Sequence, residues 1–308
     1  MNNDLRISAW GIRHALGPIS LPVRNDGGEI EWIQVTEGKP DVAIEEIPQH
    51  IADVFRVNEW EVPDWYLNNA DADSLGELRR NLDAIGSRIT TVTIDGPYAG
   101  AGDPVHREED LREIERELEM MSALGVVSAR VNLAPPPIVQ AGSIAGFDVV
   151  VASVRRLSAF AQSHGIRLLI ENHCELTSTP EDVMHFLDAV GPEVGFILDT
   201  GNIEPLQTAV LATFEGAPFG FVEDITPVLS FITALAERAS IVHVKTYGFQ
   251  EDGTPVLYDI RTVLQSIADA GYGGPITIEC AQFDVPEQSY ATIQRTHELI
   301  NATHPMSR

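Results

Sequence analysis

Two acidic residues follow short aliphatic runs in one stretch of the chain, at positions where they could do chemistry together. The run 167–170 precedes Glu171, and the run 194–198 precedes Asp199. If the two runs are neighbouring parallel strands, both carboxylates lie at the same edge of a sheet, because the carboxyl ends of parallel strands meet there. Two carboxylates brought together in this way either bind a cation or transfer protons.

The segment between these runs predicts the helix that a parallel pair of strands requires. Ser178 or Thr179 suits the N-cap, because a hydroxyl at that position accepts a hydrogen bond from a free backbone N–H group. Pro180 suits the first helical position, and Gly191 ends the helix. The stretch 167–202 therefore predicts a strand, a helix and a second strand, with a carboxylate at the end of each strand.

Composition and charge exclude several classes of protein. The 308 residues are 44% hydrophobic and 21% charged, which is typical of a globular chain with a full core. The formal net charge of −26, from 20 basic and 46 acidic residues, argues against a broad surface for nucleic acid or anionic membrane. Cys174 and Cys280 are the two cysteines and imply no disulfide framework. Neither a signal segment nor an apolar run of about 18 residues stands out, so we expect a cytoplasmic protein without a membrane span.

Eight short strand-like segments alternate with eight helical ones along the chain. This alternation implies right-handed βαβ units, and eight units in about 250 residues or a little more are typical of a closed barrel. We therefore expect an α/β fold, a (β/α)8 TIM barrel that forms a single domain over residues 1–308. An open doubly wound sheet would need a glycine-rich phosphate turn after the first strand, and residues 10–13 (WGIR) do not supply one. The expected strands are 5–10, 57–62, 89–94, 126–131, 167–170, 194–198, 241–244 and 276–280, and the expected helices are 41–55, 74–85, 108–124, 149–163, 180–190, 224–238, 259–270 and 286–302. Turn residues at 17–18 and 25–28 predict irregular structure after the first strand.

Polar residues at the ends of the expected strands indicate a metal site. In such a barrel they point into the site at the carboxyl-terminal face, and Glu171, Asp199, His243 and Glu279 end the fifth to eighth strands. Three carboxylates and one imidazole suit a divalent cation of intermediate hardness and leave coordination positions open for substrate oxygens. We expect Mn²⁺ first, with Mg²⁺, Co²⁺ or Zn²⁺ as alternatives. Lys245 shares a strand face with His243, because side chains alternate along a strand.

Other polar residues near the expected strand ends are candidates for contacts with a substrate. This set consists of Glu61, Asn132, His173, Asn202 and Gln282. Lys245 is a candidate catalytic group, because a cation at this rim would stabilise a developing oxyanion or orient a hydroxyl group.

Four motifs carry a resemblance to a known family: ENHCELTSTPEDV (171–183), LDTGN (198–202), HVK (243–245) and GYGGPITIE (271–279). Together they resemble the xylose-isomerase-like barrel superfamily, and more closely its sugar-phosphate isomerase/epimerase branch. The resemblance implies that Glu171, Asp199, His243 and Glu279 hold the metal. It also implies that Glu171 and Glu279 flank the substrate and shuttle protons.

The chain departs from the family pattern at three places. Asn202 stands where many members have a second histidine, and Thr246 stands where many have an aspartate. The segment EDGTPVLYDI (251–260) replaces the usual glycine-rich stretch. These departures leave the expected metal ligands unchanged and leave the substrate and the reaction open.

The expected reaction is enediolate chemistry on a sugar or polyol. A metal chelated by a hydroxy-ketone polarises the carbonyl and acidifies the neighbouring C–H bond. Glu171 and Glu279 can then remove and return the proton as acid/base groups. We therefore expect a metal-dependent isomerase or epimerase that acts on a small molecule, unphosphorylated because no phosphate-binding glycine loop or arginine cluster stands out.

Several alternatives share this site. The same groups would serve β-elimination of water, as in a keto-polyol (inosose-type) dehydratase, and some members of the superfamily cleave C-glycosides with a small partner subunit. The superfamily's DNA-repair endonuclease branch needs a basic groove and further His and Asp ligands, which this chain lacks. A non-catalytic sugar-binding barrel is the alternative outside the enzymes, and a homo-oligomer is open.

Overall fold

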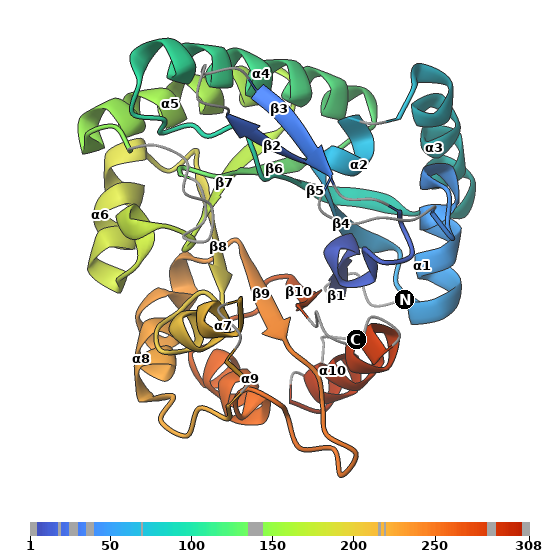
Figure 1. The fold of residues 1–308 in the computed structure, drawn as a ribbon, viewed down its shortest axis with the longest axis vertical. Coiled ribbons are helices and arrows are strands. Elements are labelled where there is room, and N and C mark those ends of the chain that lie inside the picture. Colours follow the sequence, from blue (N-terminus) through green and yellow to red (C-terminus); the bar gives the residue numbers. More distant parts are fainter. Residues whose placement is uncertain are drawn as a thin grey trace.

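The chain forms a closed barrel of eight parallel strands (Figure 1). The computed structural model describes residues 5–17, 20–24, 30–34, 40–68, 70–134, 144–214, 217–218, 220–281 and 288–303. The strands pair in the order β1-β10-β9-β8-β7-β6-β5-β4, and β4 closes the ring onto β1. Their bounds are β1 (Leu5–Ser8), β4 (Glu59–Pro63), β5 (Arg88–Ile94), β6 (Ser128–Val131), β7 (Arg167–Glu171), β8 (Gly195–Asp199), β9 (Ile241–Thr246) and β10 (Ile276–Cys280). The expected (β/α)8 TIM barrel is confirmed.

Helices follow every barrel strand and surround the barrel (Figure 1). Those that match the eight expected helices are α1 (Ile47–Phe55), α3 (Ala72–Ile85), α4 (Pro104–Ala123), α5 (Phe147–Ser163), α6 (Pro180–Val190), α8 (Thr226–Leu235), α9 (Ile260–Asp269) and α10 (Ser289–Thr303). Among the described residues, no helix is both long enough and apolar enough to cross a membrane.

Two strands and two α-helices in the described part of the chain were not expected from the sequence. The strands β2 (Ser20–Arg24) and β3 (Ile30–Gln34) form an antiparallel hairpin, and the helices are α2 (Asp64–Asn68) and α7 (Leu206–Phe214). The prediction of irregular structure was wrong for the hairpin, where Pro22 pairs with Trp32 although a proline in a short run normally argues against a strand. The turn residues at 25–28 lie outside the described residues.

The helix α6 between β7 and β8 begins and ends at the residues that the sequence predicts. Thr179 is the N-cap of α6, and its Oγ1 accepts a hydrogen bond from the backbone N–H of Asp182 at 3.2 Å. Pro180 occupies the first turn, and α6 ends before Gly191, whose φ of 102° is unfavourable for other residues. This connection places β7 and β8 side by side and parallel.

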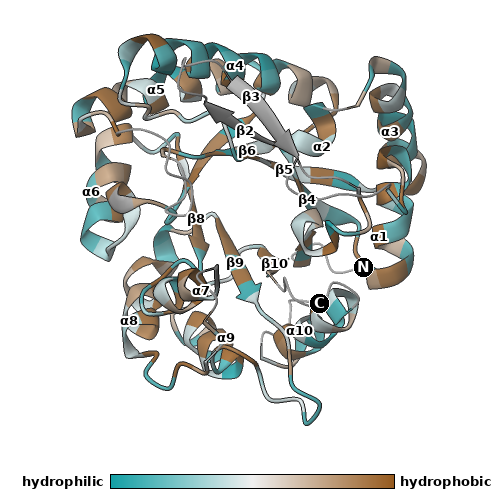
Figure 2. Ribbon diagram, in the orientation of Figure 1, coloured by the Kyte–Doolittle hydropathy of each residue, from teal (hydrophilic) through white to brown (hydrophobic). Residues whose placement is uncertain are grey.

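An apolar layer inside the barrel supports the predicted site. Leu169, Ile197 and Ile241 form a cluster of buried side chains separate from the main core. Figure 2 shows hydrophobic strands at the centre and hydrophilic residues along the outer helices. Since side chains alternate along a strand, the residue two positions later in each of these strands shares the inward face, one layer nearer the carboxyl end. Those residues are Glu171, Asp199 and His243.

Candidate metal centre

Four side chains converge at the carboxyl-terminal end of the barrel. Glu171, Asp199, His243 and Glu279 each offer one ligand atom, and these atoms all lie within 4.8 Å of one another. They come from the neighbouring strands β7, β8, β9 and β10, so adjacent strands supply the whole set. The structure thus brings together the four residues that the sequence predicted as metal ligands.

The donor atoms fit a divalent cation. His243 Nδ1 is buried without a hydrogen-bond partner in the described part of the chain, and it lies 3.3 Å from Glu171 Oε1 and 3.3 Å from Glu279 Oε2. A buried imidazole nitrogen that faces carboxylate oxygens can become a metal ligand once it gives up its proton. Three carboxylates in one buried place also need positive charge to stay ionised. The residues present therefore fit a metal such as Mn²⁺ or Zn²⁺.

The other imidazole nitrogen of His243 contacts a buried carboxylate. His243 Nε2 lies 2.9 Å from Glu61 Oε2, and Thr277 Oγ1 donates to Glu61 Oε1 at 2.6 Å. Glu61 has no exposed surface. Both of its oxygens are engaged beneath the ligand layer, so this position differs from the substrate contact expected of Glu61.

Lys245 joins two of the four candidate ligands. Its Nζ lies 3.1 Å from Asp199 Oδ2 and 2.9 Å from Glu279 Oε1, and it donates to Asn202 Oδ1 at 3.1 Å. Burial lowers the pKa of Lys245, but the carboxylates of Asp199 and Glu279 outweigh burial and hold the pKa well above its usual value. The side chain is therefore an ammonium cation at the mouth of the site.

A second cation, Arg130, lies beside Glu171. Arg130 Nε is 3.5 Å from Glu171 Oε2, and Nη2 donates to Asp95 Oδ1 at 2.7 Å. Burial raises the pKa of Glu171, yet Arg130 and then His243 lower it well below the usual range. Arg130 was not among the candidates predicted from the sequence, although it lies in β6 two residues before Asn132, which follows the strand.

The pKa values of Asp199 and Glu279 are shifted in opposite directions. Burial raises the pKa of Asp199 to about 6, with Lys245 opposing the rise and Glu279 adding to it. Burial also raises the pKa of Glu279, but Lys245 and His243 bring it down to about 2. Burial lowers the pKa of His243, but Glu61, Glu171 and Glu279 raise it well above its usual value, so a metal that binds Nδ1 must displace a proton.

The residues expected to touch substrate lie on two sides of the centre. His173 Nδ1 is 3.2 Å from Asn132 Oδ1, and Asn132 Nδ2 donates to the Asp95 carbonyl oxygen at 3.2 Å. Burial lowers the pKa of His173, which favours the neutral imidazole. On the other side, Asn202 Nδ2 is buried without a hydrogen-bond partner among the described residues, so it is a free donor at the rim. Gln282 lies outside the described residues.

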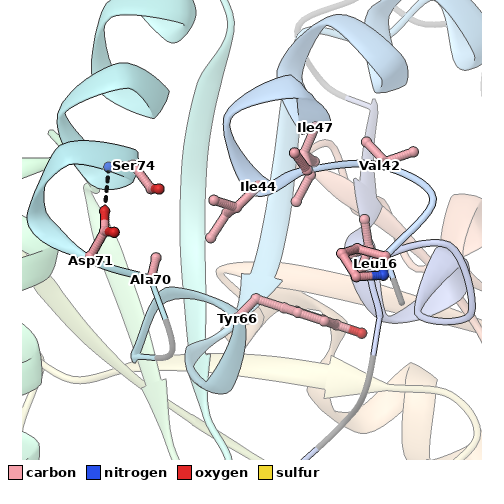
Figure 3. Close-up of a pocket in the computed structure, with 10 residues that line it drawn as sticks. Leu16, Val42, Ile44, Ile47, Tyr66, Ala70, Asp71 and Ser74 are labelled. Atoms are coloured by element: carbon pink, nitrogen blue, oxygen red, sulfur yellow. Dashed lines mark hydrogen bonds between the residues drawn. The ribbon is translucent and has the colours of Figure 1, made fainter. Parts of the chain in front are cut away.

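A separate pocket lies away from this centre. It has a volume of about 450 Å³, and its lining includes Ile44, Ile47, Tyr66 and Ser74 (Figure 3). It lies between the segment before α1 and the start of α3, and none of the predicted site residues line it. The candidate metal ligands therefore lie outside this pocket.

Comparison with known proteins identifies the family. The sequence model of the xylose isomerase-like TIM barrel family matches residues 52–299. No protein with a curated function matches the sequence.

Solved structures share the fold at low identity. D-psicose 3-epimerase with D-tagatose from Clostridium cellulolyticum H10 is similar with a TM-score of 0.65 and 15% identity, over 97% of this chain and 99% of that chain. The IOLI protein with a binding zinc atom has a TM-score of 0.64 and 14% identity, over 99% and 100% of the two chains. A xylose isomerase-like TIM barrel protein from Mycobacterium smegmatis in complex with magnesium has a TM-score of 0.61 and 17% identity, over 99% and 98%. Because the family match covers most of the sequence and the chain forms the closed barrel that the family name describes, the chain belongs to the xylose isomerase-like TIM barrel family.

Proposed function

We propose that this protein is a divalent-metal-dependent isomerase or epimerase of a sugar or related polyol. The convergence of Glu171, Asp199, His243 and Glu279 within 4.8 Å carries the proposal. Similarity to an epimerase structure with D-tagatose supports a sugar substrate, and similarity to barrels with zinc and magnesium supports a metal. Mn²⁺ is the first choice of metal, because carboxylates and one imidazole suit a cation of intermediate hardness.

The side chains around the centre have distinct roles in this proposal. A bound cation supplies Lewis acidity, which acidifies the C–H bond next to the substrate carbonyl. Glu279 and Glu171 accept and return the proton at that carbon, since each is ionised and belongs to the ligand layer. Lys245 donates hydrogen bonds to the oxygen on which negative charge develops. Asn202 offers its free Nδ2 donor to a substrate hydroxyl.

A keto-polyol dehydratase is the second candidate, and one contact favours it. Lys245 Nζ lies 2.9 Å from Glu279 Oε1, so a proton donor stands beside a proposed base. Elimination of water needs both, because one group removes a proton while another protonates the departing hydroxyl. Isomerisation of a hydroxy-ketone needs no such protonation of a leaving group.

Metal analysis and isotope exchange test the proposal together. Purified protein is reconstituted with Mn²⁺, its metal content is measured, and deuterium incorporation from solvent is followed on a panel of keto-sugars and inososes. We expect stoichiometric metal and metal-dependent exchange at a carbon next to a carbonyl, with loss of one water instead for a dehydratase. Glu279→Gln should lose exchange and bind the metal more weakly, whereas Glu298→Gln, at an exposed position in α10, should change neither. Absence of metal after reconstitution contradicts the proposal.

A further inference from the structure

Behind His243, one of the candidate metal ligands, lie two buried side chains from other strands. Glu61 comes from β4, His243 from β9 and Thr277 from β10. Thr277 lies directly beside His243 in the parallel register of β9 and β10, whereas Glu61 reaches across from the far side of β1. Glu61 Oε2 contacts His243 Nε2 at 2.9 Å, and Glu61 Oε1 accepts the Thr277 hydroxyl at 2.6 Å.

The environment of Glu61 is unusual for a carboxylate. Glu61 and Thr277 have no exposed surface, and His243 is 1% exposed. An ionised carboxylate at such a depth is costly unless hydrogen bonds satisfy it. These contacts supply one donor to each of its two oxygens.

This contact decides which nitrogen of His243 is available to a metal. A carboxylate can only accept, so it selects the form of the imidazole that carries a proton on Nε2. A metal binds only the neutral ring, and in that form the lone pair lies on Nδ1, which faces Glu171 and Glu279. A carboxylate behind a ligating histidine also raises the basicity of the ring and fixes its rotation.

We propose that Glu61, held by Thr277, sets the tautomer and orientation of His243 and thereby the affinity of the site for a divalent cation. Glu61 is then a positioning residue that acts through His243 and does not touch the substrate. This inference rests on the metal site of the proposed function and adds a determinant that lies outside the ligand set.

Glu59 provides a matched control on the same strand. It lies two residues before Glu61 and therefore shares the inward face of β4. Glu59 Oε2 pairs with Arg6 Nε at 3.3 Å, and Glu59 Oε1 pairs with Arg88. Glu59 is the first residue of β4, so these pairs lie at the end of the barrel opposite to the candidate metal ligands. It is also buried, at 7% exposure. Its loss tests what a buried strand glutamate contributes when it has no contact with His243.

Calorimetric titration of the full chain with Mn²⁺ tests the inference. Glu61→Gln keeps the shape of the side chain and removes its charge, so the Mn²⁺ affinity should fall about 10- to 100-fold. Glu59→Gln should stay within about twofold of wild type. Equal affinities in Glu61→Gln and Glu59→Gln overturn the inference. A wild-type protein that binds no Mn²⁺ overturns the proposed metal site itself, which separates the two failures.

Two further measurements separate positioning from general support of the fold. Thr277→Val removes the hydrogen bond to Glu61 while keeping its charge, and it should weaken Mn²⁺ binding less than Glu61→Gln does. This variant also carries the test if Glu61→Gln does not fold, and an unchanged affinity in it then overturns the inference. Nitrogen-15 NMR of the Zn²⁺-loaded protein should show a proton on Nε2 of His243. A proton on Nδ1 of His243 overturns the inference directly.

Discussion

Substitution of Lys245 by methionine removes the ammonium group that joins two candidate metal ligands. Lys245 Nζ lies 3.1 Å from Asp199 Oδ2 and 2.9 Å from Glu279 Oε1, and the Asp199 side chain is fully buried. Methionine keeps much of the length and the apolar stem of lysine but leaves both carboxylates without this cation. We expect the metal-free variant to lose about 3–5 kcal/mol of stability, the typical cost when one partner of a buried ion pair is removed.

A bound metal changes that magnitude. Its two positive charges pair with the same carboxylates, so the metal-loaded variant lacks chiefly the hydrogen bond from Lys245 to Asn202, worth about 1 kcal/mol. The substitution therefore costs about 2–4 kcal/mol less with metal bound than without it, and by linkage the same free energy must appear as tighter metal binding. We therefore expect Lys245→Met to bind Mn²⁺ about 30- to 700-fold more tightly than wild type.

Urea unfolding with EDTA and with saturating Mn²⁺ gives the four free energies of unfolding that this argument needs, and titration calorimetry gives the two affinities. Arg156→Gln is the matched control, because Arg156 bridges Glu108 and Glu115 on the outer helices. Its loss should cost less than about 1 kcal/mol and should not depend on Mn²⁺. The reasoning is refuted if Mn²⁺ stabilises Lys245→Met no more than wild type, or if the metal-free variant is as stable as wild type.

Two further predictions concern packing and buried charge. A Cβ atom on Gly201 would lie 2.4 Å from Lys245 Cδ and 2.6 Å from the Tyr247 hydroxyl, so Gly201→Ala should cost about 1–3 kcal/mol in calorimetric melting. An unchanged melting temperature contradicts this close packing. Burial, and then Asp64, raise the pKa of Glu117 well above its usual value, so the folded state binds this proton more tightly than the unfolded state does. The contribution of Glu117 to the free energy of unfolding is therefore fully present at acid pH and is lost as the pH rises through the folded-state pKa. Glu117→Gln should be more stable than wild type by roughly 1–3 kcal/mol at neutral pH and no more stable below about pH 4. If urea unfolding shows that Glu117→Gln gains the same stability at every pH, the raised pKa of Glu117 is not the cause.

The candidate ligand set could be predicted from positions near the ends of four strands, although His243 lies three residues before the end of β9. Glu171 and Asp199 are the last residues of β7 and β8, and alternation then fixes their inward direction. The depth of Glu61 could not be predicted in this way. Glu61 lies inside both the predicted strand 57–62 and the observed β4, but only the structure shows that its carboxylate contacts His243. Strands in a barrel are staggered, and the height of each strand end depends on partners that one sequence does not show.

The supporting cation on β6 was missed for a related reason. Arg130 lies within its strand, where a charged residue is unexpected unless it has buried partners. Those partners, Asp95 and Glu171, are 35 and 41 positions away in the sequence and are brought to it by the pairing of β6 with its neighbours β5 and β7. Element type and order follow from periodicity, but which charges meet inside the barrel follows from register.

The two glutamates proposed as acid/base groups are not equivalent, because their side chains differ in exposure. Arg130 Nε lies 3.5 Å from Glu171 Oε2, and its planar guanidinium is fixed from behind by Asp95 at 2.7 Å. Lys245 contacts Glu279 from the end of a flexible stem. Arg130 cannot turn away from Glu171 without breaking its hydrogen bond to Asp95, and Lys245 is likewise held by Asp199 and Asn202. The Glu279 side chain, however, is 15% exposed, against 4% for Glu171. Under the proposed function, Glu279 is therefore the carboxylate that is more accessible to a substrate proton, and Glu171 is the more deeply buried partner.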